Sequence, residues 1–204
     1  EADNDIRAFL FHGTENCFTS GNDIVDFLQS GALDDNHPTV KFLFCLLDLK
    51  KPVVAAVTGA AVGIGTTLLL HCDLVYADNK AKFQMPFVNL ALVPEAASSI
   101  LLPLIVGQQK AAELILLGEA FDAETAEKLT IINRVVAQDE LISFSLAQAK
   151  KLAALPPLSM QASKRLLRHN QAEVKAQMKL ELVEFAERLQ SDEAKQRFQA
   201  FLKK

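Results

Sequence analysis

One carboxylate stands alone in an uncharged part of this sequence. Glu95 is the only side chain between Lys82 and Lys110 that can carry a charge, and the residues around it, PFVNLALVPEAASSILLPLIVG, otherwise suit a protein interior. Burial against apolar neighbours raises the pKa of a carboxyl group towards neutrality, which suits a group that takes a proton and returns it. Glu95 is therefore a candidate general base. The alternative is structural, because Pro94 can open a helix whose first turn favours an acidic residue.

Two glycine turns provide further candidate positions. Gly21 supplies backbone freedom just before Asn22 and Asp23, residue types that commonly begin helices. Gly63 lies in a second glycine-rich segment, TGAAVGIG, which connects an apolar strand to a helix. A helix N-terminus presents N–H groups and a partial positive charge, so either turn can stabilise an anion. Each can equally be an ordinary connection between a strand and a helix.

The segments that hold these residues alternate between strand and helix patterns. Short apolar and β-branched runs predict strands over residues 7–12, 53–57, 73–77, 82–83 and 131–136. Helices are predicted after Asp23, where Ile24, Phe27 and Leu28 form an apolar stripe, and over residues 40–49, 66–71, 96–104 and 110–117. Asp122 is expected to cap the next helix. This order of elements predicts an α/β fold.

The chain is expected to divide into two regions. Residues 1–138 form the predicted α/β core, and residues 139–204 are helical throughout, with a break at Pro156 and Pro157 and a long amphipathic stretch over 172–202. The sequence begins almost directly on a strand, so we expect an N-terminal part of the core to be missing from this chain.

Composition excludes some classes of function. With 21 basic and 25 acidic residues among 204, the chain lacks the basic excess of a protein that binds nucleic-acid phosphates. The uncharged run over residues 52–70 is interrupted by proline and glycine, so a membrane helix is not expected there.

The residue types that bind metals show no metal-site spacing. Cys17, Cys45 and Cys72 are far apart and contain no close pair typical of zinc or redox sites. The four histidines are expected at the surface or in packing roles, and they are His12, His37, His71 and His169. We therefore expect no metal and a reducing compartment, the cytoplasm.

One resemblance fails on spacing. TGAAVGIG resembles the dinucleotide loop of short-chain dehydrogenases, and Tyr76 with Lys80 resembles their catalytic pair. In that family several strand-helix units separate the loop from the pair, whereas only 12 residues separate Gly63 from Tyr76 here. An oxidoreductase is therefore only a remote alternative.

A second resemblance covers nearly the whole chain. The segments FTSGNDIVDF, KKPVVAAVTGAAVGIGTTLLLHCDLVYA, AKFQMPFVNLALVPEAASSILLPLIVG and FDAETAEKL…INRVV, in this order and spacing, resemble the crotonase superfamily of enoyl-CoA hydratases and isomerases. The resemblance is strongest over residues 18–106. It implies a crotonase-like spiral of strand-strand-helix units with a C-terminal helical extension. It also implies an acyl-CoA thioester as substrate, assembly as a homotrimer or hexamer, and no cofactor, since CoA enters as part of the substrate.

The resemblance assigns roles to particular residues. The backbone N–H groups of Asn22 and Ile64 would form the oxyanion hole that holds negative charge on the thioester oxygen, and Glu95 would be the catalytic base. The residues expected at the substrate site are Ser20, Gly21, Asp23, Gly63, Phe87, Leu90 and Leu92. Within this set, Asp23 is expected to cap a helix and not to touch the substrate.

The choice of reaction depends on the number of carboxylates. Hydratases of this family use two, and this sequence has Thr67 and Phe87 at those positions, whereas Glu95 falls where the delta-3, delta-2 enoyl-CoA isomerases carry their single base. We therefore predict an isomerase that moves a double bond from the 3- to the 2-position of an enoyl-CoA. One alternative is a hydratase-like enzyme. The other is a non-catalytic crotonase-fold binding protein, because the bulky Ile64 lies beside the expected oxyanion hole.

Overall fold

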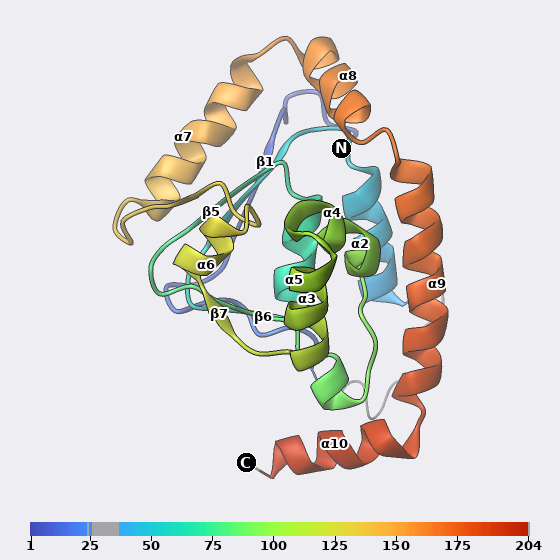
Figure 1. The fold of residues 1–204 in the computed structure, drawn as a ribbon. Helices are drawn as coiled ribbons and strands as arrows, with labels where there is room; N and C mark the ends of the chain where they lie inside the picture. The colour runs from blue at the N-terminus through green and yellow to red at the C-terminus, as the bar shows by residue number, and fades with distance from the viewer. Residues whose placement is uncertain (24, 26–36, 204) are drawn as a thin grey trace.

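The first six strands of the chain belong alternately to two different sheets. The computed structural model describes residues 1–23, 25 and 37–203 (Figure 1). The first sheet is entirely parallel and has the order β1 (Phe9–His12), β3 (Val53–Val57), β5 (Leu74–Ala77) and β8 (Arg134–Val135). The second has the order β2 (Cys17–Thr19), β4 (Ala60–Val62), β6 (Lys82–Gln84) and β7 (Phe121–Asp122), with only β7 antiparallel to its neighbour.

Helical segments follow these strand pairs. The pair β3 and β4 leads into α3 (Ile64–Thr67) and the 3₁₀ turn η1 (Leu68–His71), and the pair β5 and β6 leads into η2 (Val88–Leu90) and α4 (Ser98–Val106). Further helices are α2 (Pro38–Asp48), α5 (Gln108–Ala112), the π-helical turn η3 (Glu113–Leu117) and α6 (Ala123–Lys128). This repeated strand-strand-helix order is the predicted crotonase-like fold, which is confirmed.

The central strand β3 is buried on both faces, as its uninterrupted apolar sequence predicts. Ala55 and Val57 belong to the main core, between the sheets and helices α2, α4 and α9. Val54 and Ala56 point the other way and pack in a smaller cluster with α7 (Leu141–Ala154). Side chains on this strand alternate between the two clusters because successive residues of a strand face opposite sides.

The C-terminal helices wrap around the core. Helix α8 (Pro157–Leu167) lies at one end, α9 (Gln171–Leu189) runs along the side of α2 and α4, and α10 (Asp192–Leu202) crosses the opposite end (Figure 1). Lys164 of α8 donates to Asp73 at 2.7 Å and Arg168 donates to the same carboxylate at 3.0 Å. This ion-pair network attaches the helical region to the start of β5.

Most predicted elements are confirmed, but the sequence does not predict the short strands β2 and β7, and three further details differ. Residues 60–62, expected in a loop, form β4, because β2 and β6 lie on either side and pair with them. Only residues 134–135 of the strand expected over 131–136 pair with β5. The long helix expected over 172–202 is interrupted at Ser191, whose hydroxyl accepts the N–H of Ala194 and caps α10.

Two other expectations concern the ends of helices and the division of the chain. Asp122 caps α6 as predicted, accepting the N–H of Thr125 at 2.9 Å. The apolar stripe of Ile24, Phe27 and Leu28 lies outside the described residues. The division into regions 1–138 and 139–204 stays a prediction.

Within the described residues, no helix is both long and apolar enough to cross a membrane.

The close approach of α3 to β2 gives a test of the fold. A Cβ atom added to Gly65 would lie 2.8 Å from the backbone oxygen of Thr19 and 2.7 Å from its Cγ2. We expect Gly65→Ala to lower the free energy of unfolding by about 1–3 kcal/mol, because part of β2 must move. Chemical denaturation measures this. Thr19→Ser in the same background removes the Cγ2 contact but not the carbonyl contact, so it should restore only part of the loss; an unchanged midpoint for Gly65→Ala contradicts the packing.

Candidate active site

A cleft of about 590 Å³ joins both glycine turns to Glu95. Its walls come from the turn after β2, the N-terminus of α3, the η2 segment, the turn before α4 and helices α9 and α10. The residues that line it are Ser20, Gly21, Asn22, Val62, Gly63, Ile64, Gln84, Pro86, Phe87, Asn89, Leu90, Leu92, Glu95, Phe185, Arg197, Ala200 and Phe201. The described lining is therefore mostly apolar with few polar groups, as in small-molecule sites generally.

The two glycine turns lie against each other at this cleft. Gly21 has φ +93° and Gly63 has φ +57°, a region that side chains with a Cβ rarely adopt. A Cβ on Gly21 would lie 2.9 Å from the carbonyl oxygen of Val62, which directly precedes the second turn. Ile64 is the first residue of α3, so its N–H has no acceptor within its own helix. The fold thus brings Asn22 and Ile64 to the same wall.

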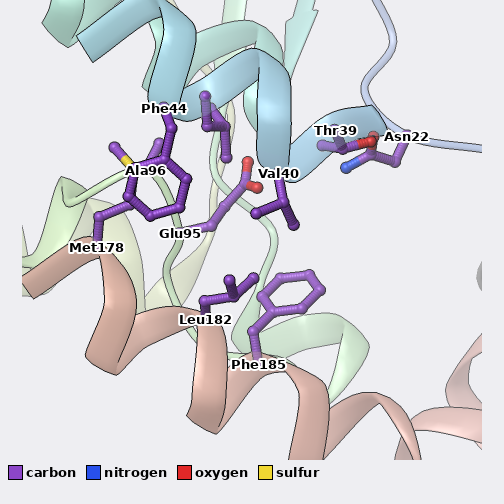
Figure 2. Close-up of a pocket in the computed structure, with 10 residues that line it drawn as sticks. Asn22, Thr39, Val40, Phe44, Glu95, Ala96, Met178, Leu182 and Phe185 are labelled. Carbon is purple, nitrogen blue, oxygen red and sulfur yellow. The ribbon is translucent and has the colours of Figure 1, made fainter. Parts of the chain in front are cut away.

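Glu95 is buried between two helices. Its side chain is 8% exposed, and Figure 2 shows its carboxyl group between Val40 and Phe44 of α2 and Leu182 and Phe185 of α9. This apolar pocket is continuous in lining with the cleft, because Asn22, Glu95 and Phe185 border both. The carboxyl group is therefore removed from bulk water while it borders the cleft.

The surroundings of Glu95 raise its pKa from 4.5 to about 7. Desolvation by burial is the largest cause, since it disfavours the charged form. The hydroxyl of Thr67 donates to Oε1 of Glu95 at 3.2 Å and opposes this effect, whereas the charge of Glu181 adds to it. A carboxyl group with a pKa near neutrality can both accept and return a proton at physiological pH.

The backbone after Glu95 adopts an unusual conformation. Ala96 and Ala97 have φ values of +59° and +55°, left-handed conformations that are costly for alanine. The N–H and the hydroxyl of Ser98 both donate to the carbonyl oxygen of Glu95, at 3.0 and 2.6 Å. His71 is buried, and its Nε2 bonds the carbonyl oxygen of Ala96 at 2.7 Å. Burial lowers the pKa of His71 to about 4, so this ring is neutral and Nε2 donates.

The structure brings together nine of the ten predicted site residues. The nine that line the cleft are Ser20, Gly21, Asn22, Gly63, Ile64, Phe87, Leu90, Leu92 and Glu95. Asp23 does not line it. Its side chain is exposed and accepts the N–H of Val25 at 2.8 Å, and the helix that it is expected to cap lies outside the described residues.

Sequence reasoning missed the contribution of the C-terminal helices. Phe185 of α9 and Arg197, Ala200 and Phe201 of α10 line the cleft. The last three are spaced i, i+3 and i+4, which places them on one face of a helix. That spacing identifies a common face but does not reveal what the face meets.

Comparison with known proteins shows the family of this chain. The family model described as enoyl-CoA hydratase/isomerase matches residues 1–204. The chain belongs to the enoyl-CoA hydratase/isomerase family. This family member is 46% identical in sequence to an enoyl-CoA hydratase/isomerase from Pseudoalteromonas atlantica T6c, whose crystal structure it matches with a TM-score of 0.93 over 99% of this chain and 81% of that one.

Curated relatives of this family member carry both isomerase and hydratase names. Enoyl-CoA delta isomerase 2 of Rattus norvegicus is 37% identical over 170 residues, which is 80% of this chain and 44% of that protein. 2,3-Dehydroadipyl-CoA hydratase of Escherichia coli (strain K12) is 31% identical over 172 residues, which is 83% of this chain and 67% of that protein. The chain spans about half the length of the two isomerases of rat and mouse that it matches.

Membership of this family sets the dehydrogenase alternative aside. Tyr76, one half of the supposed catalytic pair, lies on β5 and packs edge-to-face on Phe144 with ring centroids 5.0 Å apart. It is absent from the described lining of the cleft.

Burial of Glu95 has a predicted effect on stability. Its pKa of about 7 in the folded state exceeds the value of 4.5 for an exposed carboxyl group, so folding becomes less favourable as the pH rises from about 4.5 to 7. At pH 8, Glu95→Gln should therefore raise the free energy of unfolding by up to about 3 kcal/mol, at 1.36 kcal/mol for each pH unit between the two pKa values. Below pH 4.5 the wild type is protonated in both states, and the two proteins should differ little. Denaturation at pH 4 and pH 8 measures both values; equal stability at pH 8 contradicts a desolvated carboxylate.

Proposed function

We propose that this protein is an enoyl-CoA isomerase that moves a double bond from the 3- to the 2-position of an acyl-CoA thioester. The observation that carries the proposal is a single desolvated carboxyl group, Glu95, bordering a mostly apolar cleft that also contains the two glycine turns at Gly21 and Gly63. Among the described lining residues, Glu95 is the only carboxylate. One carboxylate is sufficient for a reaction in which a proton leaves one carbon and returns to another.

The proposed reaction uses the three groups in turn. Ionised Glu95 removes a proton from C2 of the 3-enoyl thioester, and the electron pair of that C–H bond delocalises into a dienolate. The N–H groups of Asn22 and Ile64 hold the negative charge on the thioester oxygen, each contributing roughly 3 kcal/mol to the transition state. The protonated carboxyl group then returns the proton to C4, which gives the conjugated 2-enoyl product. No atom is gained or lost, and the chemistry requires neither a metal nor a redox cofactor.

The same residues disfavour hydration of a 2-enoyl thioester. Hydration by this family uses two carboxylates to position and activate water, and the corresponding positions here are Thr67 and Phe87. Thr67 is fully buried and donates its hydroxyl to Glu95, and Phe87 is a buried apolar wall of the cleft. Neither side chain can accept a proton from water usefully.

Assembly and location are also proposals. The resemblance to crotonases implies a homotrimer or a hexamer built from two trimers, and we propose this state for the protein. We also propose a cytoplasmic location, although one similar protein, from Mus musculus, is named peroxisomal and another, from Dictyostelium discoideum, is named mitochondrial.

Loss of the proposed base should abolish isomerisation. We expect Glu95→Gln to lower kcat for a 3-enoyl-CoA by about 10²–10⁴-fold, the usual contribution of a general base. In the wild type, kcat/KM should rise tenfold per pH unit up to about pH 7 and then level off, since only the ionised carboxylate accepts the proton. Glu119→Gln removes an exposed carboxylate outside the described cleft lining and should leave turnover unchanged. Full turnover by Glu95→Gln removes the assigned base.

Hydration offers a separate test of the reaction type. Because the described cleft lining has only one carboxylate, we expect the addition of water to crotonyl-CoA to be negligible beside the isomerisation of a 3-enoyl-CoA. The loss of the 2-enoyl absorbance on hydration measures this rate directly. A hydration rate equal to or above the isomerisation rate would establish a hydratase instead, and no turnover of either thioester would favour a binding protein.

A further inference from the structure

A second buried carboxylate bonds to the backbone just after Glu95. Glu181 lies on α9 and is only 6% exposed. Its Oε2 accepts the N–H of Ala97 at 2.6 Å, and its Oε1 accepts both the N–H of Ser99, at 2.9 Å, and the hydroxyl of Ser99. Glu181 is absent from the described cleft lining, so its carboxylate serves the chain that carries Glu95 and not a substrate.

The segment that Glu181 holds lacks a cap of its own. Ala97 occupies the position before α4, where a serine, threonine or aspartate side chain would normally accept a helix N–H, and α4 has no acidic residue in its first turn. The carboxylate of Glu181 fills this role from another helix. It also bonds to Ala97, the second of two consecutive residues in the left-handed conformation. Such conformations persist only where the surrounding contacts enforce them.

We propose that Glu181 is a positioning residue for Glu95: from α9 it accepts the N–H groups of Ala97 and Ser99 and so fixes the left-handed turn between Glu95 and α4, and this keeps the carboxyl group of Glu95 at the cleft. The proposal rests on the isomerase function proposed above for its kinetic readout. It assigns α9 a part in the reaction without any contact between Glu181 and the substrate.

Other contacts support the same turn from both sides. His71 of η1 donates to the carbonyl oxygen of Ala96 at 2.7 Å, on the residue next to the one that Glu181 holds. Gln177, one helical turn before Glu181, donates to the hydroxyl oxygen of Ser99 at 3.0 Å. The turn is therefore held between η1 and α9, and it has little freedom to carry Glu95 away from the cleft.

Glu181 also acts on Glu95 through its charge. The titratable side chains that face this turn within the described chain are His71 and Glu181. The lowered pKa of His71, about 4, keeps its ring neutral above pH 5, so Glu181 supplies the charge that acts on Glu95. That negative charge raises the pKa of Glu95. An action of Glu181 on Glu95 can thus be separated from general stabilisation, because a loss of global stability alone does not move the pH dependence of turnover.

The test compares Glu181→Gln with Glu184→Gln, the same change at an exposed position of the same helix. For Glu181→Gln we expect kcat for a 3-enoyl-CoA to fall 10- to 100-fold with KM changed less than threefold, and the rising limb of the pH profile to move to lower pH. Glu184→Gln should match the wild type. Unchanged kcat, or a lower kcat with the limb unmoved, overturns the proposal.

Ser99→Ala covers the case in which Glu181→Gln does not fold. It keeps the charge of Glu181 and removes one of its three donors, so kcat should fall several-fold while the limb stays in place. Wild-type kcat in this variant overturns the proposal.

A measurement without turnover separates this proposal from the proposed function. The ¹³C resonance of the Glu95 carboxyl group, identified by its loss in Glu95→Gln, reports the titration of Glu95 directly. It should titrate at lower pH in Glu181→Gln than in the wild type, and an unchanged titration overturns the proposal. If the wild type does not isomerise 3-enoyl thioesters, the function fails while this titration still decides whether Glu181 acts on Glu95.

Discussion

Desolvation of one carboxyl group is the constraint on which the site depends. Glu95 lies between α2 and α9 against apolar side chains, and this burial raises its pKa to about 7. The protein tolerates the buried acid because Thr67 donates a hydrogen bond to it and because it can take up a proton. The environment that disfavours its charge is also the one that makes it a useful base near neutral pH.

The two-sheet architecture places the proposed anion-binding groups at the cleft that this carboxyl group borders. A strand from each sheet followed by a helix places successive helix N-termini at the same end of the core, where the chain must turn sharply. Gly21 and Gly63 allow these turns through positive φ angles, and Gly65 lets α3 approach the backbone of β2. Small residues thus permit the close approach that brings Asn22 and Ile64 to one wall of the cleft.

The C-terminal helices complete the site. Helix α9 supplies Met178, Leu182 and Phe185 to the apolar pocket around Glu95, and it supplies Glu181, which bonds the turn after Glu95. Helix α10 adds Arg197 and Phe201 to the cleft wall. The ion pairs of Lys164 and Arg168 with Asp73 hold the end of α8 on the core. The helical region is therefore part of the candidate active site.

The sequence by itself determined the local features: the isolated acid Glu95, the glycines before Asn22 and Ile64, the buried strand β3 and the cap at Asp122. Each depends on a residue type and its immediate neighbours. The tertiary structure alone decided that residues 60–62 form a strand, that α10 faces the cleft and that Glu181 meets Ala97. These contacts join segments far apart in the chain, and an amphipathic helix pattern shows which face is apolar but not which surface that face will meet.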